Sequence, residues 1–424
     1  MASTPSATDA RMLVKGVVFR LTSDLPPEAI SLLHDFRLAV NKAVRASLEA
    51  RVSSRNGIAK LFYRTFREEH PGMYAKHLLS SFEVAAVILK NYRKRLRHGR
   101  PCGIPFAKRL MMRAENQAYK LDRTEGIIDL PIRAGCHVEL RLVVSRYHRR
   151  YLDDETLSLG SLTVLPDRVI VAFRKEPPKP IAASSVLSLD TNERSLDGIF
   201  VEGGGKGDGS CVQVKAAFPE VATIQQRHHE RRRRLQKKKA HDRRLTRVLC
   251  GREGEREHHR VDYRLHRVAN AVLEFAEGHK SAIVLEDLRG IRSNKNKDLN
   301  RRLSLWPRRK LHQIIEYKAA WKGIQVIKVD PRYSSRRCPA CGRISDSRMG
   351  TNREFVCDCG WHLDRHINAS MNLLQTAISK GLEVAGGLWF SPGAFQHDVV
   401  MTLYEPAMAA RSEPNGTSHI GMTS

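Results

Sequence analysis

The sequence has no long apolar segment. No stretch of its 424 residues approaches the roughly 18 uninterrupted apolar residues that a membrane-spanning helix needs, and the opening MASTPSATDARM lacks the apolar core of a signal peptide. Apolar residues still make up 41% of the chain, which is enough for real cores in two to four domains. We therefore expect a soluble cytoplasmic protein with no membrane partner.

Acidic residues are scarce relative to basic ones. Asp and Glu number 45 against 73 Lys and Arg, which leaves a formal net charge of +28. A surplus of this size has to be held near a polyanion or near counterions. Nucleic acid is the first candidate, because an anionic membrane would be a less natural partner for a chain without an apolar span.

Cysteine is too scarce for a disulfide scaffold. There are eight cysteines, and four of them fall within residues 338–359, whereas Cys102, Cys136, Cys211 and Cys250 are scattered. The cluster suggests a bound metal and a reducing compartment.

The clustered cysteines have the spacing of a zinc site. Cys338-Pro-Ala-Cys341-Gly is followed fifteen positions later by Cys357-Asp-Cys359-Gly. In a CxxC turn two thiolates reach one ion, and the following glycine frees backbone amides to bond the sulfurs. Four thiolates predict a structural, tetrahedral Zn²⁺ with no position left for water. His362 could replace one thiolate as a ligand.

The amino-terminal half alternates between β and helical patterns. Residues 13–19 alternate like a strand, and from Pro26 apolar residues recur at helical spacing. From about residue 126 the period returns to two, up to a proline-rich linker at 176–180. This order predicts a small β-barrel interrupted by a helical insertion.

Beyond the linker the elements follow an RNase-H-like order. Three apolar strands precede a basic helical region at about 222–278, the strand SAIVLED, a helix, the strand IQVIKVD and a final helix from about Ile367 to Leu382. The glycine-rich GGGKGDG could suggest a phosphate loop, but Lys206 is not followed by Ser or Thr and no helix follows, so we expect a hairpin loop. The order predicts an α/β fold whose two central strands are adjacent and parallel.

Two carboxylates fall at the ends of those central strands. Asp190 ends the first strand and Glu286 ends the fourth. Either residue alone could simply cap a turn. Together, neighbouring carboxylates repel, which raises a pKa or recruits a divalent cation. Two Mg²⁺ ions about 3.5–4 Å apart would activate water and stabilise the leaving oxygen in phosphodiester hydrolysis.

The densest charge lies at residues 227–244, RHHERRRRLQKKKAHDRR. Like charges this close destabilise a bare helix, so we expect a nucleic-acid phosphate backbone to offset them, although a solvated basic face is the alternative. An aromatic residue among arginines, such as Tyr333, can stack on a base. The predicted nucleic-acid-binding residues are Arg231, Arg232, Arg233, Arg234, Lys237, Lys238, Lys239, Arg332 and Tyr333.

Four features follow one another along the chain: Asp190, LEDLRGIR around Glu286, VDPRYSSRRCPACG, and CDCGWHLDRHINASMNLL. With them the sequence resembles the TnpB family of transposon-encoded RNA-guided nucleases, relatives of type V CRISPR effectors, over about residues 184–382. The resemblance implies a guide RNA and a duplex DNA target in a prokaryotic cytoplasm, with Mg²⁺ or Mn²⁺ at the catalytic site. The domains it implies are a wedge-like β domain (1–25 and 126–180), a helical recognition lobe (26–125), a RuvC-like nuclease domain (184–335 and 363–383), a zinc ribbon (336–362) and a poorly ordered tail (384–424).

One position departs from the family pattern. The family's third catalytic residue is the Asp of a D-x-N-A-A pattern, and His366 stands there within DRHINAS. Asp364, the nearby carboxylate, is either a substitute metal ligand or a cap of the final helix. Two functions stay open: an RNA-guided DNA endonuclease that uses Asp190, Glu286 and Asp364, and a guide-directed DNA-binding protein or repressor with a weakened or inactive site.

Overall fold

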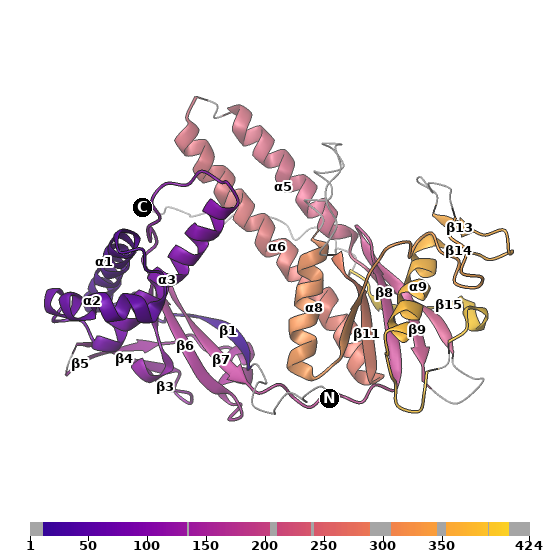
Figure 1. The fold of residues 1–424 in the computed structure, drawn as a ribbon, viewed down its shortest axis with the longest axis horizontal. Coiled ribbons are helices and arrows are strands. Elements are labelled where there is room, and N and C mark those ends of the chain that lie inside the picture. The colour runs from indigo at the N-terminus through magenta and orange to yellow at the C-terminus, as the bar shows by residue number, and fades with distance from the viewer. Residues whose placement is uncertain are drawn as a thin grey trace, which may run out of the picture. The chain divides into compact units, whose positions relative to one another are not determined.

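The computed structural model describes residues 12–133, 135–203, 210–238, 241–288, 307–345, 353–388 and 390–406. They form two compact units, Met1–Pro177 and Pro178–Ser424, so the division falls within the proline-rich linker (Figure 1). Lys239, most of the glycine-rich loop with Lys206, and the polar loop at 289–305 lie outside the described residues. None of the helices in the described part has the length and apolar character that a membrane crossing requires.

The first unit combines two antiparallel sheets with helices. Its strands are β1 (Leu13–Arg20), β2 (Met112–Ala114), β3 (Lys120–Asp122), β4 (Ile127–Arg133), β5 (Cys136–Arg141), β6 (Ser158–Leu165) and β7 (Arg168–Lys175). Its helices are α1 (Pro27–Glu49), α2 (Arg55–Glu69), α3 (Ala75–Arg97), α4 (Arg146–Leu152) and the 3₁₀ turn η1 (Asn116–Ala118). One sheet has the strand order β1-β7-β6-β2, and the other has the order β3-β4-β5.

The helical insertion ends earlier than the sequence predicted. Helices α1, α2 and α3 pack around buried aromatic residues such as Phe36, Phe66 and Phe82. Strands β2 and β3 then follow within the range 26–125 that was predicted as helical, and β2 pairs with β6 of the larger sheet. The predicted boundary at residue 125 is therefore wrong, because strands of three residues are too short to show a period of two.

The second unit is a mixed α/β fold around one six-stranded sheet with the order β12-β11-β8-β9-β10-β15. Its strands are β8 (Ser185–Thr191), β9 (Ser195–Glu202), β10 (Cys211–Ala217), β11 (Ser281–Glu286), β12 (Val326–Val329) and β15 (Phe395–Tyr404). The two-stranded pair β13 (Glu354–Val356) and β14 (His362–Asp364) lies apart from it. The helices are α5 (Pro219–Lys238), α6 (Arg243–Gly278), α8 (Arg308–Lys322), α9 (Arg365–Ser379) and the 3₁₀ turn η3 (Pro392–Ala394).

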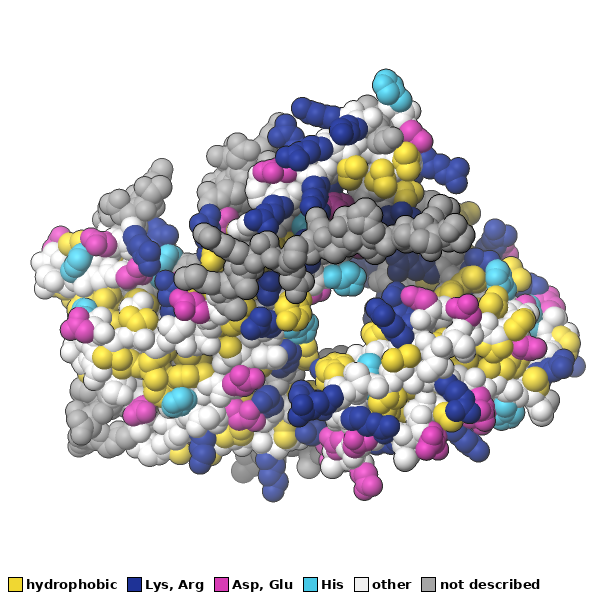
Figure 2. Space-filling model, turned by 180° about the vertical axis from the view of Figure 1, so that it is seen from behind, with side chains coloured by type: hydrophobic (Ala, Val, Ile, Leu, Met, Phe, Trp, Pro, Cys, Tyr) yellow, Lys and Arg dark blue, Asp and Glu magenta, His cyan; other side chains and the backbone are white. Residues whose placement is uncertain are grey.

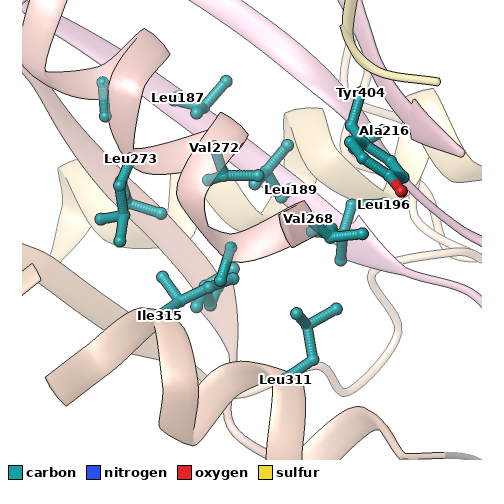
Figure 3. Packing of buried hydrophobic residues seen from close by; sticks show 14 of the residues in the cluster. Leu187, Leu189, Leu196, Ala216, Val268, Val272, Leu273, Leu311, Ile315 and Tyr404 are labelled. Carbon is teal, nitrogen blue, oxygen red and sulfur yellow. The ribbon is translucent and has the colours of Figure 1, made fainter. Parts of the chain in front are cut away.

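Helices cover both faces of this sheet, which explains why its central strands are apolar throughout. Alternating residues of a strand point to opposite faces. Leu187 and Leu189 of β8 pack with α6 and α8 in one core, as Figure 3 shows. Val186 packs with α9 in a second core on the other face, and Ser188 there donates a hydrogen bond of 2.8 Å to the carbonyl oxygen of Ser370. The even-numbered side chains of β8, including Asp190, therefore face α9.

The carboxyl-terminal tail contains a strand. Residues 384–424 were predicted to be poorly ordered, but β15 pairs in parallel with β10 and forms an edge of the six-stranded sheet. Tyr404 at its end packs into the core beside Leu196 and Ala216 (Figure 3). The prediction is wrong for residues 395–404, because the pairing partner of β15 lies far away in the sequence. Residues 407–424 lie outside the described part.

Gly198→Ala should destabilise the second unit. A Cβ atom at Gly198 in β9 would lie 2.0 Å from the carbonyl oxygen of Ser188, and backbone in a central strand cannot give way cheaply. We expect the free energy of unfolding, measured by urea denaturation, to fall by about 1–3 kcal/mol or more. Gly254→Ala in α6 is the matched control: a Cβ atom there meets nothing within 4 Å, so it should be neutral or stabilising. Equal stability of the two variants would contradict this account.

Candidate active site and cysteine cluster

Asp190 and Glu286 lie side by side at the carboxyl ends of two adjacent strands. Strands β8 and β11 pair in parallel with Leu189 opposite Leu285, so the next residue of each strand is a carboxylate. Both side chains face α9, both residues are 7% exposed, and the two carboxyl groups share a hydrogen bond. The structure thus brings together the two residues that the sequence singled out.

The electrostatics of this pair favour a bound proton or a cation. The pKa of Asp190 is raised to about 6, chiefly by burial and also by the neighbouring charge of Asp197, while the hydrogen bond with Glu286 and the charge of Arg365 act to lower it. Burial, together with the contact to Asp190, raises the pKa of Glu286 well above its usual range. Two carboxylates this close cannot both be ionised without a compensating positive charge. The pair is therefore a place where a divalent cation could replace a shared proton.

His366 contacts Asp190 directly. Helix α9 begins at Arg365, earlier than the predicted start near Ile367, so His366 lies in its first turn. The Nδ1 atom of His366 is 2.8 Å from Oδ2 of Asp190. Burial lowers the pKa of His366, so the ring is neutral at neutral pH and its Nδ1–H can donate to the Asp190 carboxylate.

Asp364 makes the contacts of a helix cap. Its Oδ1 accepts a hydrogen bond of 2.8 Å from the backbone amide of His366, and its Oδ2 accepts one of 2.7 Å from Nε of Arg353. Burial acts to raise the pKa of Asp364, but the bonds from Arg353 and His366 outweigh it and lower the pKa. The side chain is ionised and engaged on both oxygens, which is the capping role that the sequence left open beside a metal-ligand role.

Sequence reasoning missed a further carboxylate, Asp197. It lies in β9 directly opposite Asp190 in the antiparallel register, and it is 4% exposed. Its neighbours Ile199 and Val201, which alternate with it along the strand, pack in the core against α9, so Asp197 points to the same face as Asp190 and Glu286. The sequence contains one signal for this residue. In LDGIFV, Asp197 is followed at alternate positions by Ile199 and Val201, so it begins a row of apolar residues on that face of the strand.

The four clustered cysteines converge on one point. Sγ of Cys338 lies 3.6 Å from Sγ of Cys359, and Sγ of Cys341 lies 3.6 Å from Sγ of Cys357. All four sulfurs lie within 4.8 Å of one another. A tetrahedral zinc ion with Zn–S bonds of about 2.3 Å needs sulfur–sulfur separations of about 3.8 Å, so the residues fit Zn²⁺. The shorter second knuckle, with one residue between its cysteines, is compatible with this geometry.

Helix α9 holds the segment that leads into this cluster. The Nδ2 atoms of Asn368 and Asn372 donate hydrogen bonds of 2.9 and 2.8 Å to the carbonyl oxygen of Arg337, and Nε2 of Gln375 donates one of 2.9 Å to the carbonyl oxygen of Pro339. These three amides recur at helical spacing on one side of α9. The same helix carries His366, so the cysteine cluster and the carboxylates share one rigid support.

Comparisons with known proteins agree with this arrangement. The family model of the Cas12f1-like TNB domain matches residues 309–373, and the model of the uncharacterized protein MJ0013 family matches residues 32–128. The TnpB-like protein MJ0751 of Methanocaldococcus jannaschii is 27% identical over 253 residues, which cover 58% of this chain and 88% of that protein. The CRISPR-associated endodeoxyribonuclease Cas12f1 of Sulfoacidibacillus thermotolerans is 37% identical over 119 residues, 27% of either chain.

These similarities support a TnpB-family protein that is related to the type V effectors. The fold of the chain agrees with this relationship. The Cas12f1 chain in a complex with single guide RNA and target DNA superposes with a TM-score of 0.53 at 12% identity, over 85% of this chain and 98% of the other. The second unit accordingly has the mixed α/β fold of this structural neighbour.

The predicted basic residues of this TnpB-family chain lie on α5, which packs against α6 in an antiparallel pair. Arg231, Arg233, Arg234, Lys237 and Lys238 are exposed, and Figure 2 shows dark blue Lys and Arg side chains along the end of this helical pair. Lys239, also predicted, lies outside the described residues.

Part of this charge is offset within the chain. Arg232 is partly buried and forms an ion pair with Glu257 of α6, and Arg231 lies 3.4 Å from Glu253. Arg252 and Arg256 of α6 join Arg231, Arg234 and Lys238 around a pocket of about 430 Å³. Sequence reasoning missed these two arginines, because only the packing of the two helices brings them to the α5 surface.

Arg332 and Tyr333 follow β12 and precede the cysteine cluster. Arg332 is exposed and pairs loosely with Asp330, at 3.6 Å. Tyr333 is 51% exposed and has a φ of 61°, a left-handed conformation that is uncommon for a bulky residue. The guanidinium of Arg336 lies 5.8 Å from the centre of its ring. An exposed ring beside arginines suits a contact with a base.

Cys338→Ser should remove the metal from the cysteine cluster. We expect about one tightly held zinc ion per chain in the purified protein, and its loss together with a lower melting temperature in this variant, because the cluster has little else to fold around. Cys250→Ser in α6, outside the cluster, is the matched control and should keep its zinc. The measurement is elemental analysis of freshly purified protein. Zinc-free wild-type protein would contradict the assignment.

Asp190→Asn should raise the melting temperature at pH 8 in buffer without added divalent cations, because it removes one of two adjacent buried charges. The pKa of Asp190 is raised to about 6 in the folded protein. The free energy of unfolding therefore falls as the pH rises through that value, and the loss is absent below the pKa that Asp190 has in the unfolded chain. We therefore expect a gain of a few degrees at pH 8 that shrinks toward pH 5.

Thermal melts followed by circular dichroism at both pH values measure this gain. Asp398→Asn, an exposed carboxylate on the edge strand of the same sheet, serves as the control and should change little. A melting temperature of Asp190→Asn below that of the wild type at pH 8 would refute the repulsion between Asp190 and Glu286.

Proposed function

We propose that this chain is an RNA-guided DNA endonuclease of the TnpB type, which hydrolyses DNA phosphodiesters by two-metal catalysis. The observation that carries the proposal is the placement of Asp190 and Glu286, both buried, at the carboxyl ends of adjacent parallel strands. The names of its relatives support it: one is an endodeoxyribonuclease, and another is called a putative RNA-guided DNA endonuclease.

The carboxylates fit Mg²⁺ or Mn²⁺. Both ions are hard and prefer oxygen ligands, and a pair of carboxyl groups close enough to share a hydrogen bond can exchange the proton for a cation. Two such cations would supply the activation of a water molecule and the stabilisation of the leaving oxygen. Asp190 and Glu286 would hold and orient them, and β8 and β11, buried on both faces, keep these side chains in one geometry.

We assign to the remaining parts of the chain the roles that the family resemblance implies. The exposed cations of α5, with Arg252 and Arg256 of α6, would bind the phosphates of the guide RNA. In the first unit, the β1-β7-β6-β2 sheet would serve as the wedge domain, and α1 to α3 as the recognition lobe that contacts duplex DNA. Residues 336–362 would form a zinc ribbon held by the four cysteines.

A second candidate function rests on the contacts of His366 and Asp364. His366 takes the place of the family's third Asp and bonds to Asp190, while Asp364 is engaged as a cap and with Arg353. If no other carboxylate enters the site, cation binding is weakened, and the chain becomes a guide-directed DNA-binding protein or repressor.

Cleavage of a guide-matched duplex tests the proposal. Protein purified at low salt should carry RNA, and sequencing that RNA identifies the guide. The complex should then cut a duplex that contains the matching sequence, within a library of flanking sequences, in Mg²⁺ or Mn²⁺. Asp190→Ala should abolish cutting and leave RNA and DNA binding intact, because Asp190 is buried and is not one of the exposed cations that would bind phosphates.

The outcomes separate the two candidates. Guide-dependent binding without cutting by the wild type would leave the repressor, and an absence of copurified RNA together with salt-independent RNA affinity would reject both.

A further inference from the structure

Three carboxylates form a row across the centre of the sheet, on three adjacent strands. Glu286 in β11 neighbours Asp190 in β8, and Asp190 lies directly opposite Asp197 in β9. All three side chains point to the face that α9 covers, since residues that alternate with them pack in the core against α9. Side chains directly opposite one another on one face of a sheet are in contact distance. The row therefore places three carboxylates on neighbouring strands where the family pattern supplies two from these strands.

Asp197 is a buried carboxylate with neutral partners. Its Oδ2 accepts hydrogen bonds from Nδ2 of Asn192, at 2.6 Å, and from the hydroxyl of Ser195. Within the described part of the chain it forms no ion pair, in contrast to Asp364 with Arg353 and Glu253 with Arg231. Burying a carboxylate is unfavourable unless a positive charge compensates it. A buried carboxylate that forms no ion pair and lies beside two other carboxylates therefore favours a cation at this place.

The two other candidates for a third ligand are less suitable. Imidazole nitrogen is a poor ligand for Mg²⁺, and the Nδ1 atom of His366 is already engaged with Asp190. Asp364 uses both of its oxygens, for the helix cap and for Arg353. Asp197 needs no rearrangement of the backbone to join Asp190, because the strand pairing already places them opposite each other.

The side of the site next to Asp197 is also shaped for a phosphate group. A pocket of about 540 Å³ is lined by Asp197 and His366 and by four basic residues: Arg194, Lys215, Arg353 and Arg365. Cations around a cavity attract the phosphates of a nucleic-acid strand. A strand that enters this pocket would reach the row of carboxylates from the β9 side.

We propose that Asp197 is the third carboxylate ligand of the divalent cations at this site and compensates for His366. The inference rests on the proposed nuclease function. It assigns a metal-binding role to a residue seven positions after Asp190. The substitute ligand therefore lies in the same segment as Asp190 and not in the DRHINAS segment, where His366 replaces the family's Asp. It also assigns the basic pocket next to Asp197 to the phosphates of the DNA strand to be cut.

The test combines Asp197→Asn with His366→Asp. Asp197→Asn keeps the size of the side chain and an oxygen for Asn192 and Ser195, and it should reduce guide-directed cleavage in Mn²⁺ by about 10- to 100-fold with guide RNA and target binding unchanged. Adding His366→Asp to this variant should restore most of the cleavage, because it returns a carboxylate to the family position. Loss of a merely structural contact at Asp197 would not be rescued in this way.

Mn²⁺ affinity, measured by isothermal titration on the same RNA-bound proteins, provides a readout that does not need cleavage. Asp197→Asn should weaken it about 10-fold or more, and the double variant should recover it. Glu202→Gln, which changes the exposed carboxylate at the far end of β9, is the matched control and should leave both readouts unchanged.

Three outcomes would overturn the inference. Equal cleavage and equal Mn²⁺ affinity of wild type and Asp197→Asn would remove Asp197 from the site and leave the proposed nuclease function standing. Cutting by His366→Asp alone, with a silent wild type, would show that Asp197 does not compensate, and would favour the repressor. If no variant binds or cuts a guide-matched target, the proposed function fails; unchanged Mn²⁺ affinity in Asp197→Asn would then reject the inference as well.

Discussion

The parallel pairing of β8 with β11 is the constraint on which the second unit depends. Parallel neighbours cannot be joined by a tight turn, so a long connection has to leave the sheet and return. Here β9, β10, α5 and α6 make up that connection, and α6 packs back on one face of the sheet while α9 covers the other. Both faces of β8 and β11 are therefore buried, and the carboxylates near the carboxyl ends of these strands lie next to each other inside the protein. The proximity of Asp190 and Glu286 follows from this topology and from the register of Leu189 with Leu285.

Burial is also what makes these carboxylates chemically unusual. In water two neighbouring carboxylates would be screened, but at 7% exposure their charges are held at close range with little solvent. Elsewhere the second unit balances its buried acids with cations: Glu253 contacts His228 and Arg231, and its pKa is lowered although burial acts in the opposite direction. At the row formed by Asp190, Glu286 and Asp197, the side-chain nitrogens bonded to the two aspartates are neutral: the ring of His366 contacts Asp190, and the amide of Asn192 donates to Asp197. The same fold thus stabilises one set of acids as structural ion pairs and holds two aspartates of the other set against neutral hydrogen-bond partners.

Helix α9 links the two metal-binding candidates. Its first turn presents His366 to Asp190, and the amides of Asn368, Asn372 and Gln375 hold the backbone that leads into the first pair of cysteines. Asp364 caps the helix and ties it to Arg353, which precedes β13 of the cysteine segment. Order in the cysteine cluster therefore supports the position of the first turn of α9. A structural ion far from the carboxylates can in this way affect the geometry at Asp190.

The sequence by itself determined the features that local pattern encodes. Buried strands of near-continuous apolar residues, the CxxC knuckle, the run of arginines on α5 and the ends of strands at Asp190 and Glu286 can all be read along the chain, because each depends on neighbours a few residues apart. Only the tertiary structure decided what depends on distant partners. It placed β15 beside β10 and added Arg252 and Arg256 to the basic surface. It also placed the beginning of α9 at Arg365, where Asp364 caps the helix, and set Asp197 opposite Asp190. A strand has no local mark of its register, since the side chain that it faces belongs to another strand. For this reason the residue that best compensates for His366 could not be seen in the segment where the family pattern is broken.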